Sequence, residues 1–467
     1  MKRIFFIPIF IFLTHCFCLA QANITIKFET QQEYDSVKVQ GFESDSGYYT
    51  VSSQPFKMTV NLQKKKSLET GLYFIVCDNN MTGAFIISSA TGQSFSITIK
   101  DDGIDFYGSV ENQHYKEYLE QMQEFEKQMG NLNQEFQDAK SRLPQYMLGP
   151  IVDTLNAKAL RIQSAQNSYQ DKVIDENAGT LLASIITVSK ELPQPPKEIS
   201  NNRFKMQEYY MQHYFDNFPW NDPRIFRTPL GDKKIKDFNS FIVQWQRPDL
   251  YPYILSTLKA AKVNTESYYI LFDKLEKVIG NHASPYRKES IYIEMLKDML
   301  SLPKLPELRK RHCTYELKTI DKNHEGERAN NFRMVTNTGD TTTLYDIQSE
   351  YLLLYLQHPT CPTCQRVRKM MADFPFLNKA IASGRLKVLT VYFEDEENIW
   401  NDFIKSPEAN PNYMHGWNFD QSISDEGLYD TRAIPYMFIL DKDKRILYKN
   451  VMESSLEDVI KQLNIIY

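Results

Sequence analysis

The fold of the C-terminal part is decided by the stretch Tyr351-Leu-Leu-Leu-Tyr-Leu-Gln-His-Pro-Thr-Cys361-Pro-Thr-Cys364-Gln-Arg-Val-Arg-Lys-Met-Met371. An apolar run of strand length is followed by a proline, two cysteines and a basic, helix-forming segment. This order places Cys361 at the N-terminus of the predicted helix, where unpaired N–H groups and the helix dipole favour a thiolate. Cys364 follows one turn later, so one thiol can attack and the other can resolve a mixed disulfide.

The other cysteines favour this redox interpretation over a metal site. Of the six cysteines, Cys16 and Cys18 lie in a predicted signal peptide, which leaves Cys77 and Cys313 beside the pair. Four cysteines in so long a chain do not form a disulfide scaffold. A zinc site needs a second close pair, and Cys77 and Cys313 are far apart in sequence, so no metal is expected. Each is predicted to be a buried small hydrophobe, with a disulfide between them as the alternative.

Length and composition indicate a globular protein of two to four domains. The chain has 467 residues, which is too long for a single ordinary hydrophobic core. Of these residues 42% are hydrophobic and 24% are charged, as in globular proteins. Its net charge of -5 argues against a dedicated nucleic-acid binder.

The N-terminus predicts export. Met1-Lys2-Arg3 precedes the apolar run 4–13, and Ala20 and Ala22 follow as candidate cleavage positions. A positive start, a short apolar core and small residues at the end are typical of a cleaved signal peptide. Large residues stand before Cys16 and Cys18, so soluble secretion or a periplasmic location is favoured over lipidation.

Changes of hydrophobic period divide the rest of the chain. From Asn23 to about Gly108, apolar residues alternate with polar ones between turn residues, which predicts a small antiparallel sandwich or barrel. From Asn112 the spacing changes to three and four residues, which predicts a helical hairpin that turns near 144–150. Its apolar stripe is also compatible with a dimer seam, so the oligomeric state is left open.

Further helices are predicted at 181–192, 203–215, 235–245, 250–262, 267–279 and 290–300. From about His324 the pattern becomes a β-hairpin, a βαβ unit and a ββα unit. The predicted organisation is a signal peptide (1–22), a β domain (23–110), an all-α domain (111–320) and an α/β domain (324–467).

The α/β segment resembles the thioredoxin fold, because the CxxC follows the first long strand and a proline opens a later one. Gly326-x-x-Ala329-x-x-Phe332 and the Pro-Thr inside the CxxC resemble the TlpA/ResA-type thiol-disulfide oxidoreductases. The whole layout resembles secreted proteins of Bacteroidota with a DUF4369-like β domain and a DUF5106-like helical region. The segments 209–218 and 227–229 carry the helical likeness.

The resemblance implies roles for individual residues. Cys361 would be the nucleophile and Cys364 the resolving thiol. Pro435 would be a cis-proline facing them, and the backbone of Ile434 would pair with an extended substrate.

The chain departs from the family pattern in three places. Thr360 replaces the tryptophan usual before the first cysteine, and His358-Pro359 interrupts the usual approach to it. Tyr355 stands where the family has a buried acid that helps to move a proton. A water, His358 or Glu394 would then take that part, and His358 is a candidate modulator.

The predicted function is therefore an enzyme, a thiol-disulfide oxidoreductase that reduces or isomerises protein disulfides without a cofactor. Its expected partners are disulfide-containing substrate proteins and a membrane electron donor or other redox partner. The departures at Thr360 and Tyr355 leave a rival open, namely a binding or dimerisation protein of the cell envelope whose thioredoxin-like domain is inactive.

Overall fold

The computed structural model describes residues 22–88, 92–245, 247–282, 284 and 286–463. The chain divides into two compact units, the first ending at Leu271 and the second beginning at Phe272. Apart from Ala22, the predicted signal peptide lies outside the described residues. Among the helices in the described ranges, none is both long and apolar enough to cross a membrane.

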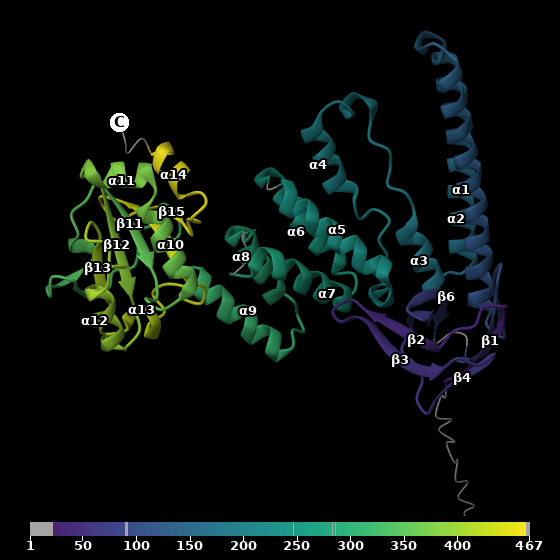
Figure 1. The fold of residues 1–467 in the computed structure, drawn as a ribbon, viewed down its shortest axis with the longest axis horizontal. Coiled ribbons are helices and arrows are strands. Elements are labelled where there is room, and N and C mark those ends of the chain that lie inside the picture. Colours follow the sequence, from purple (N-terminus) through teal and green to yellow (C-terminus); the bar gives the residue numbers. More distant parts are fainter. Residues whose placement is uncertain (1–21, 89–91, 246, 283, 285, 464–467) are drawn as a thin grey trace, which may run out of the picture. The chain divides into compact units, whose positions relative to one another are not determined.

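The first unit begins with two four-stranded sheets, drawn in purple in Figure 1. Their orders are β4-β1-β7-β8 and β3-β2-β5-β6. Side chains of both sheets, among them Ile26, Val39 and Ile75, share one buried core, so the predicted sandwich is confirmed. The strands are β1 (Ala22–Glu29), β2 (Ser36–Glu43), β3 (Gly47–Pro55), β4 (Thr59–Lys64), β5 (Gly71–Cys77), β6 (Asn80–Ile87), β7 (Ser94–Lys100) and β8 (Gly103–Tyr107).

The sandwich is not entirely antiparallel. β1 and β7 run parallel, with Ile26 beside Ile97. The sequence predicts antiparallel strands, but alternation of apolar and polar residues reports which face is buried and not the direction of a neighbour. The alternation of apolar and polar residues therefore could not predict that β7 runs parallel to β1.

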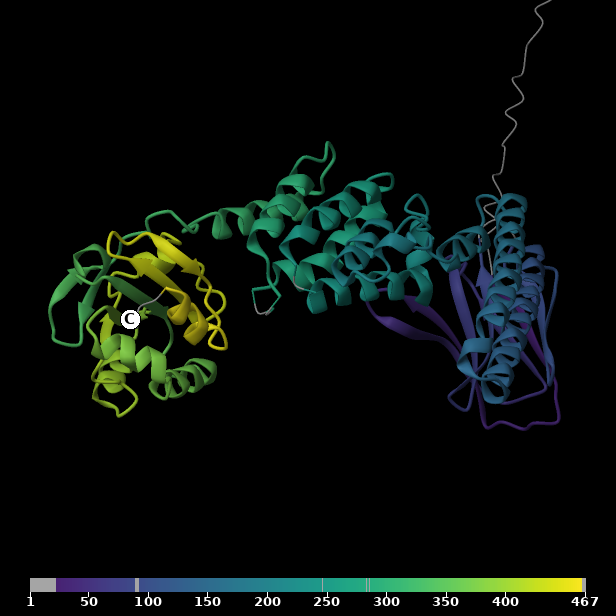
Figure 2. The same ribbon diagram turned by 90° about the horizontal axis from the view of Figure 1, so that it is seen from above.

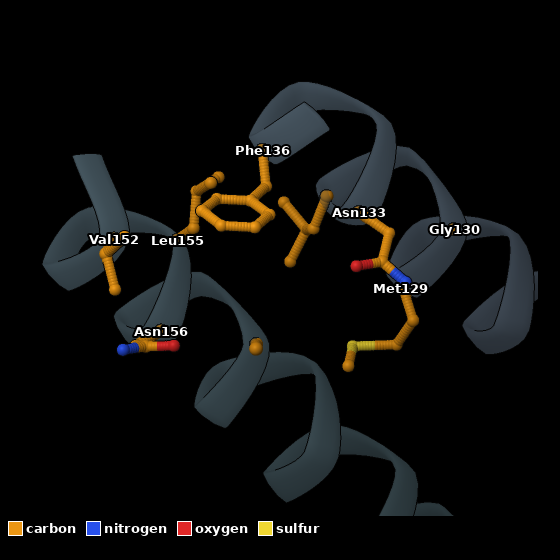
Figure 3. Close-up of a pocket in the computed structure, with 9 residues that line it drawn as sticks. Met129, Gly130, Asn133, Phe136, Val152, Leu155 and Asn156 are labelled. Atoms are coloured by element: carbon orange, nitrogen blue, oxygen red, sulfur yellow. The ribbon is translucent and has the colours of Figure 1, made fainter. Parts of the chain in front are cut away.

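A long helical hairpin follows the sandwich, and Figures 1 and 2 show its two helices side by side. α1 (Val110–Arg142) and α2 (Gly149–Glu176) pack through the predicted apolar stripe, and the turn lies at 143–148 as expected. Tyr118 stacks on Tyr169 between them. Figure 3 shows a cleft of about 350 Å³ between the helices, where Phe136 lies near Leu155. The stripe thus has an intramolecular partner.

The remaining helices of the first unit match the predicted segments. They are α3 (Leu181–Ser189), α4 (Arg203–His213), α5 (Pro229–Trp245), α6 (Tyr251–Ala261) and α7 (Thr265–Leu275), the last of which ends in the second unit. The 3₁₀ turns in and beside this region are η1 (Gln145–Met147), η2 (Lys197–Ile199), η3 (Pro223–Arg227) and η4 (Pro248–Leu250), and Glu276–Gly280 forms a π-helical turn.

The second unit contains three helices that the sequence prediction missed, among them α11 (Pro375–Ala382) and the short α13 (Ser422–Asp425). α8 (Glu289–Leu300) was expected, whereas α9 (Glu307–Ile320) was not. Its buried residues are confined to Cys313, Glu316 and Ile320, and Leu308 is 74% exposed. So narrow a buried stripe, with a glutamate in it, gives little apolar periodicity to detect.

A seven-stranded sheet of order β10-β9-β13-β12-β11-β14-β15 forms the centre of the second unit. β11, β12 and β13 are parallel to one another, whereas β14 runs antiparallel to β11. The strands are β9 (Arg333–Thr336), β10 (Thr341–Thr343), β11 (Tyr351–Leu356), β12 (Leu386–Tyr392), β13 (Met414–Trp417), β14 (Tyr436–Asp441) and β15 (Ile446–Lys449). The short β13 was not predicted, since four residues carry no readable period.

Both faces of this sheet are buried, which fits a mixed α/β layer structure. Leu353 and Tyr355 of β11 face α10, α11 and α14, and Leu352 and Leu354 face the opposite core. Figure 1 shows α10 beside β11. The helices are α10 (Pro362–Ala372), α11 (Pro375–Ala382), α12 (Glu397–Lys405), α13 (Ser422–Asp425) and α14 (Leu456–Gln462), with the 3₁₀ turn η6 (Leu344–Asp346). This arrangement is a thioredoxin fold.

Candidate functional site

The register of the sheet brings the cysteine pair and the predicted cis-proline to the same edge. Leu356, the last residue of β11, pairs with Tyr436, the first residue of β14. Cys361 lies five residues beyond Leu356, and Pro435 directly precedes Tyr436. The Ile434–Pro435 peptide bond is cis. The loop after β11 and the loop before β14 therefore leave the sheet side by side.

Cys361 is the N-cap residue of α10, and Pro362 occupies the first turn. Proline suits this position because its missing N–H would have no partner there. Burial by itself raises the pKa of the Cys361 thiol, but hydrogen bonds from Cys364 and from the Thr363 N–H, together with the charge of Arg368, outweigh it. The net result is a Cys361 pKa below its usual value. The side chain is partly exposed, so this thiol can meet a substrate.

Cys364 has the opposite environment. It is fully buried, and the burial raises its pKa to about 12, although the backbone N–H of His358 and the charge of Arg368 act against the rise. Two thiols three positions apart thus differ in exposure and in the direction of the pKa shift. An accessible thiolate beside a protected thiol is the arrangement that attack and resolution require.

Tyr355 occupies the place under α10 where the family resemblance led us to look for an acid. Its hydroxyl donates to the Cys364 carbonyl oxygen at 3.1 Å. Burial, and the nearby Cys364 thiol, raise the pKa of Tyr355 far above its ordinary value. The phenol is therefore a neutral donor that holds the first turn of α10, and it cannot serve as a carboxylate would.

Arg368 is a buried cation on the cysteine helix that the sequence reasoning missed. Its side chain is 5% exposed, and its guanidinium donates to the side chain of Gln357, to the Pro359 carbonyl at 2.9 Å and to the Glu408 carboxylate at 2.5 Å. The guanidinium also lies 4.9 Å from the centre of the Phe403 ring. Its spacing from the cysteines could have shown that it lies on their side of the helix, but the sequence could not show that it is buried.

The ring of His358, the candidate modulator, contacts Thr360 and Glu394 rather than the two thiols. Its Nδ1 accepts from the Thr360 N–H at 3.2 Å, which leaves the proton on Nε2. That nitrogen lies 3.4 Å from the Glu394 carboxylate. Glu396 completes a group whose ligand-type atoms lie within 4.8 Å of one another. His358 thus contacts a carboxylate through Nε2, and its role as a modulator stays a prediction.

The loop that carries Ile434 and Pro435 is held by buried charges. Arg432 binds Asp430 through two hydrogen bonds of 2.8 and 3.0 Å and reaches Glu316 of α9 at 2.5 Å. Arg287, which precedes α8, lies 3.4 Å from Asp430. The helical segment 287–316 therefore braces the loop before β14, a long-range connection that no sequence pattern indicated.

Two other histidines form ion pairs of their own, and two other cysteines lie buried in other elements. His213 pairs with Asp216, and His312 pairs with Glu276. Cys77 and Cys313 are buried and form no disulfide, and the two thiols of the CxxC are also unbonded to each other. The predicted disulfide alternative for Cys77 and Cys313 is thus not formed in this structure.

One family model matches the helical part of the chain. Residues 159–323 match the model of a family described as a domain of unknown function, DUF5106. This match begins within α2 and ends after α9. No curated protein matches the chain.

Two solved structures from Bacteroides match parts of the chain. A thioredoxin-like protein from Bacteroides caccae is 25% identical, with a TM-score of 0.53, and the match covers 58% of this chain and 98% of that one. The C-terminal domain of an uncharacterized Bacteroides fragilis protein is 30% identical over 30% of this chain and 98% of that one, with a TM-score of 0.29. The second score supports no inference. Residues 159–323 thus match the DUF5106 model, and the C-terminal segment has a thioredoxin fold.

Proposed function

We propose that the protein is a secreted or periplasmic thiol-disulfide oxidoreductase that reduces or isomerises disulfides in other proteins. The observation that carries the proposal is the contrast within the CxxC. Cys361 is accessible at the start of α10 with a lowered pKa, and Cys364 is buried behind it with a pKa of about 12. This contrast supports attack by Cys361 and resolution by Cys364.

The exchange proceeds in two balanced steps. The Cys361 thiolate attacks one sulfur of a substrate disulfide, a mixed disulfide forms, and the other substrate sulfur leaves as a thiolate. Cys364 then gives up its proton, attacks the Cys361 sulfur and releases the second substrate thiolate. The substrate disulfide is reduced and the Cys361–Cys364 pair is oxidised. In isomerisation the substrate's own thiol attacks the mixed disulfide instead, and Cys361 leaves as a thiolate.

Ile434 and Pro435 would present the substrate to Cys361. A cis-proline has no N–H, and the preceding residue offers a free backbone edge with which an extended peptide can pair as a short strand. The partners are then disulfide-containing proteins and a redox partner that reduces the closed couple again. A signal peptide at 1–22 would deliver the enzyme to a compartment where such substrates exist.

Trapping of mixed disulfides tests the exchange. In the Cys364→Ala variant the second step cannot occur, so we expect covalent adducts with envelope proteins that dithiothreitol releases. The matched control is Cys361→Ala, which should form none. Fractionation of cells that express the full chain tests the location.

Equilibration with glutathione, followed by counting of free thiols, measures the potential of the couple. A value near that of thioredoxin, about -270 mV, indicates a reductase, and a value near about -180 mV indicates an isomerase. A Cys361–Cys364 bond that stays closed at both of these potentials contradicts the proposal if the trapping experiment also gives no adducts. The rival binding protein with an inactive domain would then be the better account.

A further inference from the structure

Arg368 lies on the same face of α10 as the cysteines. It follows Cys364 by four residues and Cys361 by seven, and residues at these spacings stack along one side of a helix. Helical side chains lean toward the N-terminus, so the guanidinium points back toward the first turn. Its 5% exposure leaves it little contact with water. A permanent positive charge is thus fixed behind both thiols, because arginine does not lose its proton in proteins.

The contacts of Arg368 hold the loop that shapes the thiol site. Gln357 and Pro359, which it binds, flank His358. The His358 carbonyl accepts from the Cys361 N–H at 3.2 Å, and the His358 N–H faces the Cys364 sulfur. Loss of the guanidinium would therefore release the loop as well as remove a charge.

The charge of Arg368 is only partly balanced. Glu408 is its carboxylate partner and is 36% exposed, so water screens that carboxylate more than it screens the guanidinium. The buried Tyr355 hydroxyl on β11 also faces the pair and stays neutral. His358 is turned toward Thr360 and Glu394. These groups therefore produce a positive electrostatic potential at the two sulfurs.

We propose that Arg368 is a positioning residue that stabilises the reduced form of the Cys361–Cys364 couple and so directs this enzyme to disulfide isomerisation rather than to net reduction. The inference rests on the proposed function. A dithiol with a stabilised thiolate is a weak reductant, because closing the disulfide gives up that stabilisation. The same stabilisation makes Cys361 a good leaving group from a mixed disulfide. Its substrates are then proteins with non-native disulfides and a free thiol of their own.

The electron balance of this route needs no external reductant. Cys361 attacks a non-native substrate disulfide, and a substrate thiolate leaves. Another substrate thiolate then attacks the mixed disulfide at the substrate sulfur and expels the Cys361 thiolate. One disulfide is consumed and one is formed, and the enzyme returns to its dithiol state.

Charge variants of the full chain test the inference through the equilibrium constant for oxidation by glutathione disulfide. Removing the charge in Arg368→Gln should raise this constant about tenfold, which makes the reduction potential of the couple about 30 mV more negative. The same variant should reactivate scrambled ribonuclease more slowly. Arg368→Lys keeps the charge but loses the fork of hydrogen bonds, so its constant should lie between those of the parent protein and Arg368→Gln. The matched control is Arg366→Gln on the same helix, whose side chain is 53% exposed and pairs with Glu453. It should change the constant by less than about twofold.

The Glu408→Gln variant separates charge from architecture. It leaves Arg368 in place but removes its counter-charge, so the constant should fall severalfold, opposite in sign to Arg368→Gln. Thermal unfolding of each variant confirms that it is folded. Shifts of the same sign in Arg368→Gln and Glu408→Gln, or an equal shift in Arg366→Gln, would overturn the inference while the proposed function stands. Parent thiols that do not exchange with glutathione would overturn both.

Discussion

Helices α9 and α10 each carry a cysteine, and their positions give the two thiols opposite properties. Cys313 lies in the middle of α9, where every neighbouring N–H is already paired, and burial raises its pKa to about 12. Cys361 lies at the N-cap of α10, where free N–H groups hold its pKa below the ordinary value despite its burial. The comparison teaches that a position at the helix start, together with partial exposure, makes a reactive thiol.

The most direct test of this difference is to measure the rate at which each of the two thiols is alkylated. At pH 7 we expect iodoacetamide to modify Cys361 at least about 100-fold faster than Cys313, because the thiolate fraction and the exposure both favour Cys361. Mass spectrometry of timed samples gives the two rates. In urea the difference should collapse, since both pKa values then return to ordinary ones. Equal rates in the folded protein would contradict the assignment of Cys361 as nucleophile.

α9 contributes to the site by charge rather than by its thiol, and Arg432→Met tests this. The substitution leaves Glu316 without its cation and Asp430 with Arg287 alone, which should lower the free energy of unfolding of the second unit by about 3 kcal/mol. Urea unfolding measures the loss. Arg366→Met, at an exposed arginine, is the control and should change it by less than about 0.5 kcal/mol. A result for Arg432→Met as small as that of the control would show that α9 does not brace the loop.

The same charge network predicts a loss of stability in acid. Burial alone raises the pKa of the Asp430 carboxyl, but Arg432 and Arg287 hold the pKa below its usual value. A lowered pKa means stabilisation that is present above the unfolded value of about 3.9 and is lost as the pH falls through the folded value. Denaturant midpoints between pH 7 and pH 2.5 should decline below about pH 4. In Asp430→Asn this part of the decline should be absent.

The smallest expected effect concerns the thiol of α9 itself. Cys313→Ala removes a buried sulfur and should cost about 1 kcal/mol of unfolding free energy. It should leave the glutathione equilibrium of the Cys361–Cys364 couple unchanged. Cys77→Ala in the β domain should behave alike. A change of the redox equilibrium in either variant would mean that these thiols take part in the exchange.

Local chemistry made much of this molecule predictable. The spacing of Cys361 and Cys364 after an apolar strand indicated a helix start, and α10 begins there. The period change near Asn112 marked the hairpin of α1 and α2. These features follow from interactions between residues close in sequence, so the sequence alone determined them.

Only the tertiary structure decided which charges surround the thiols. Arg368 reads as a surface residue of a basic helix, yet α12 and the loop that carries Glu408 enclose it. The Arg432–Glu316 pair spans 116 residues, and α9 carried no apolar period that would have revealed it. Packing of distant segments sets burial, and burial sets the strength of a charge. The site's electrostatics are therefore a property of the fold, whereas the identity of its nucleophile is written in the sequence.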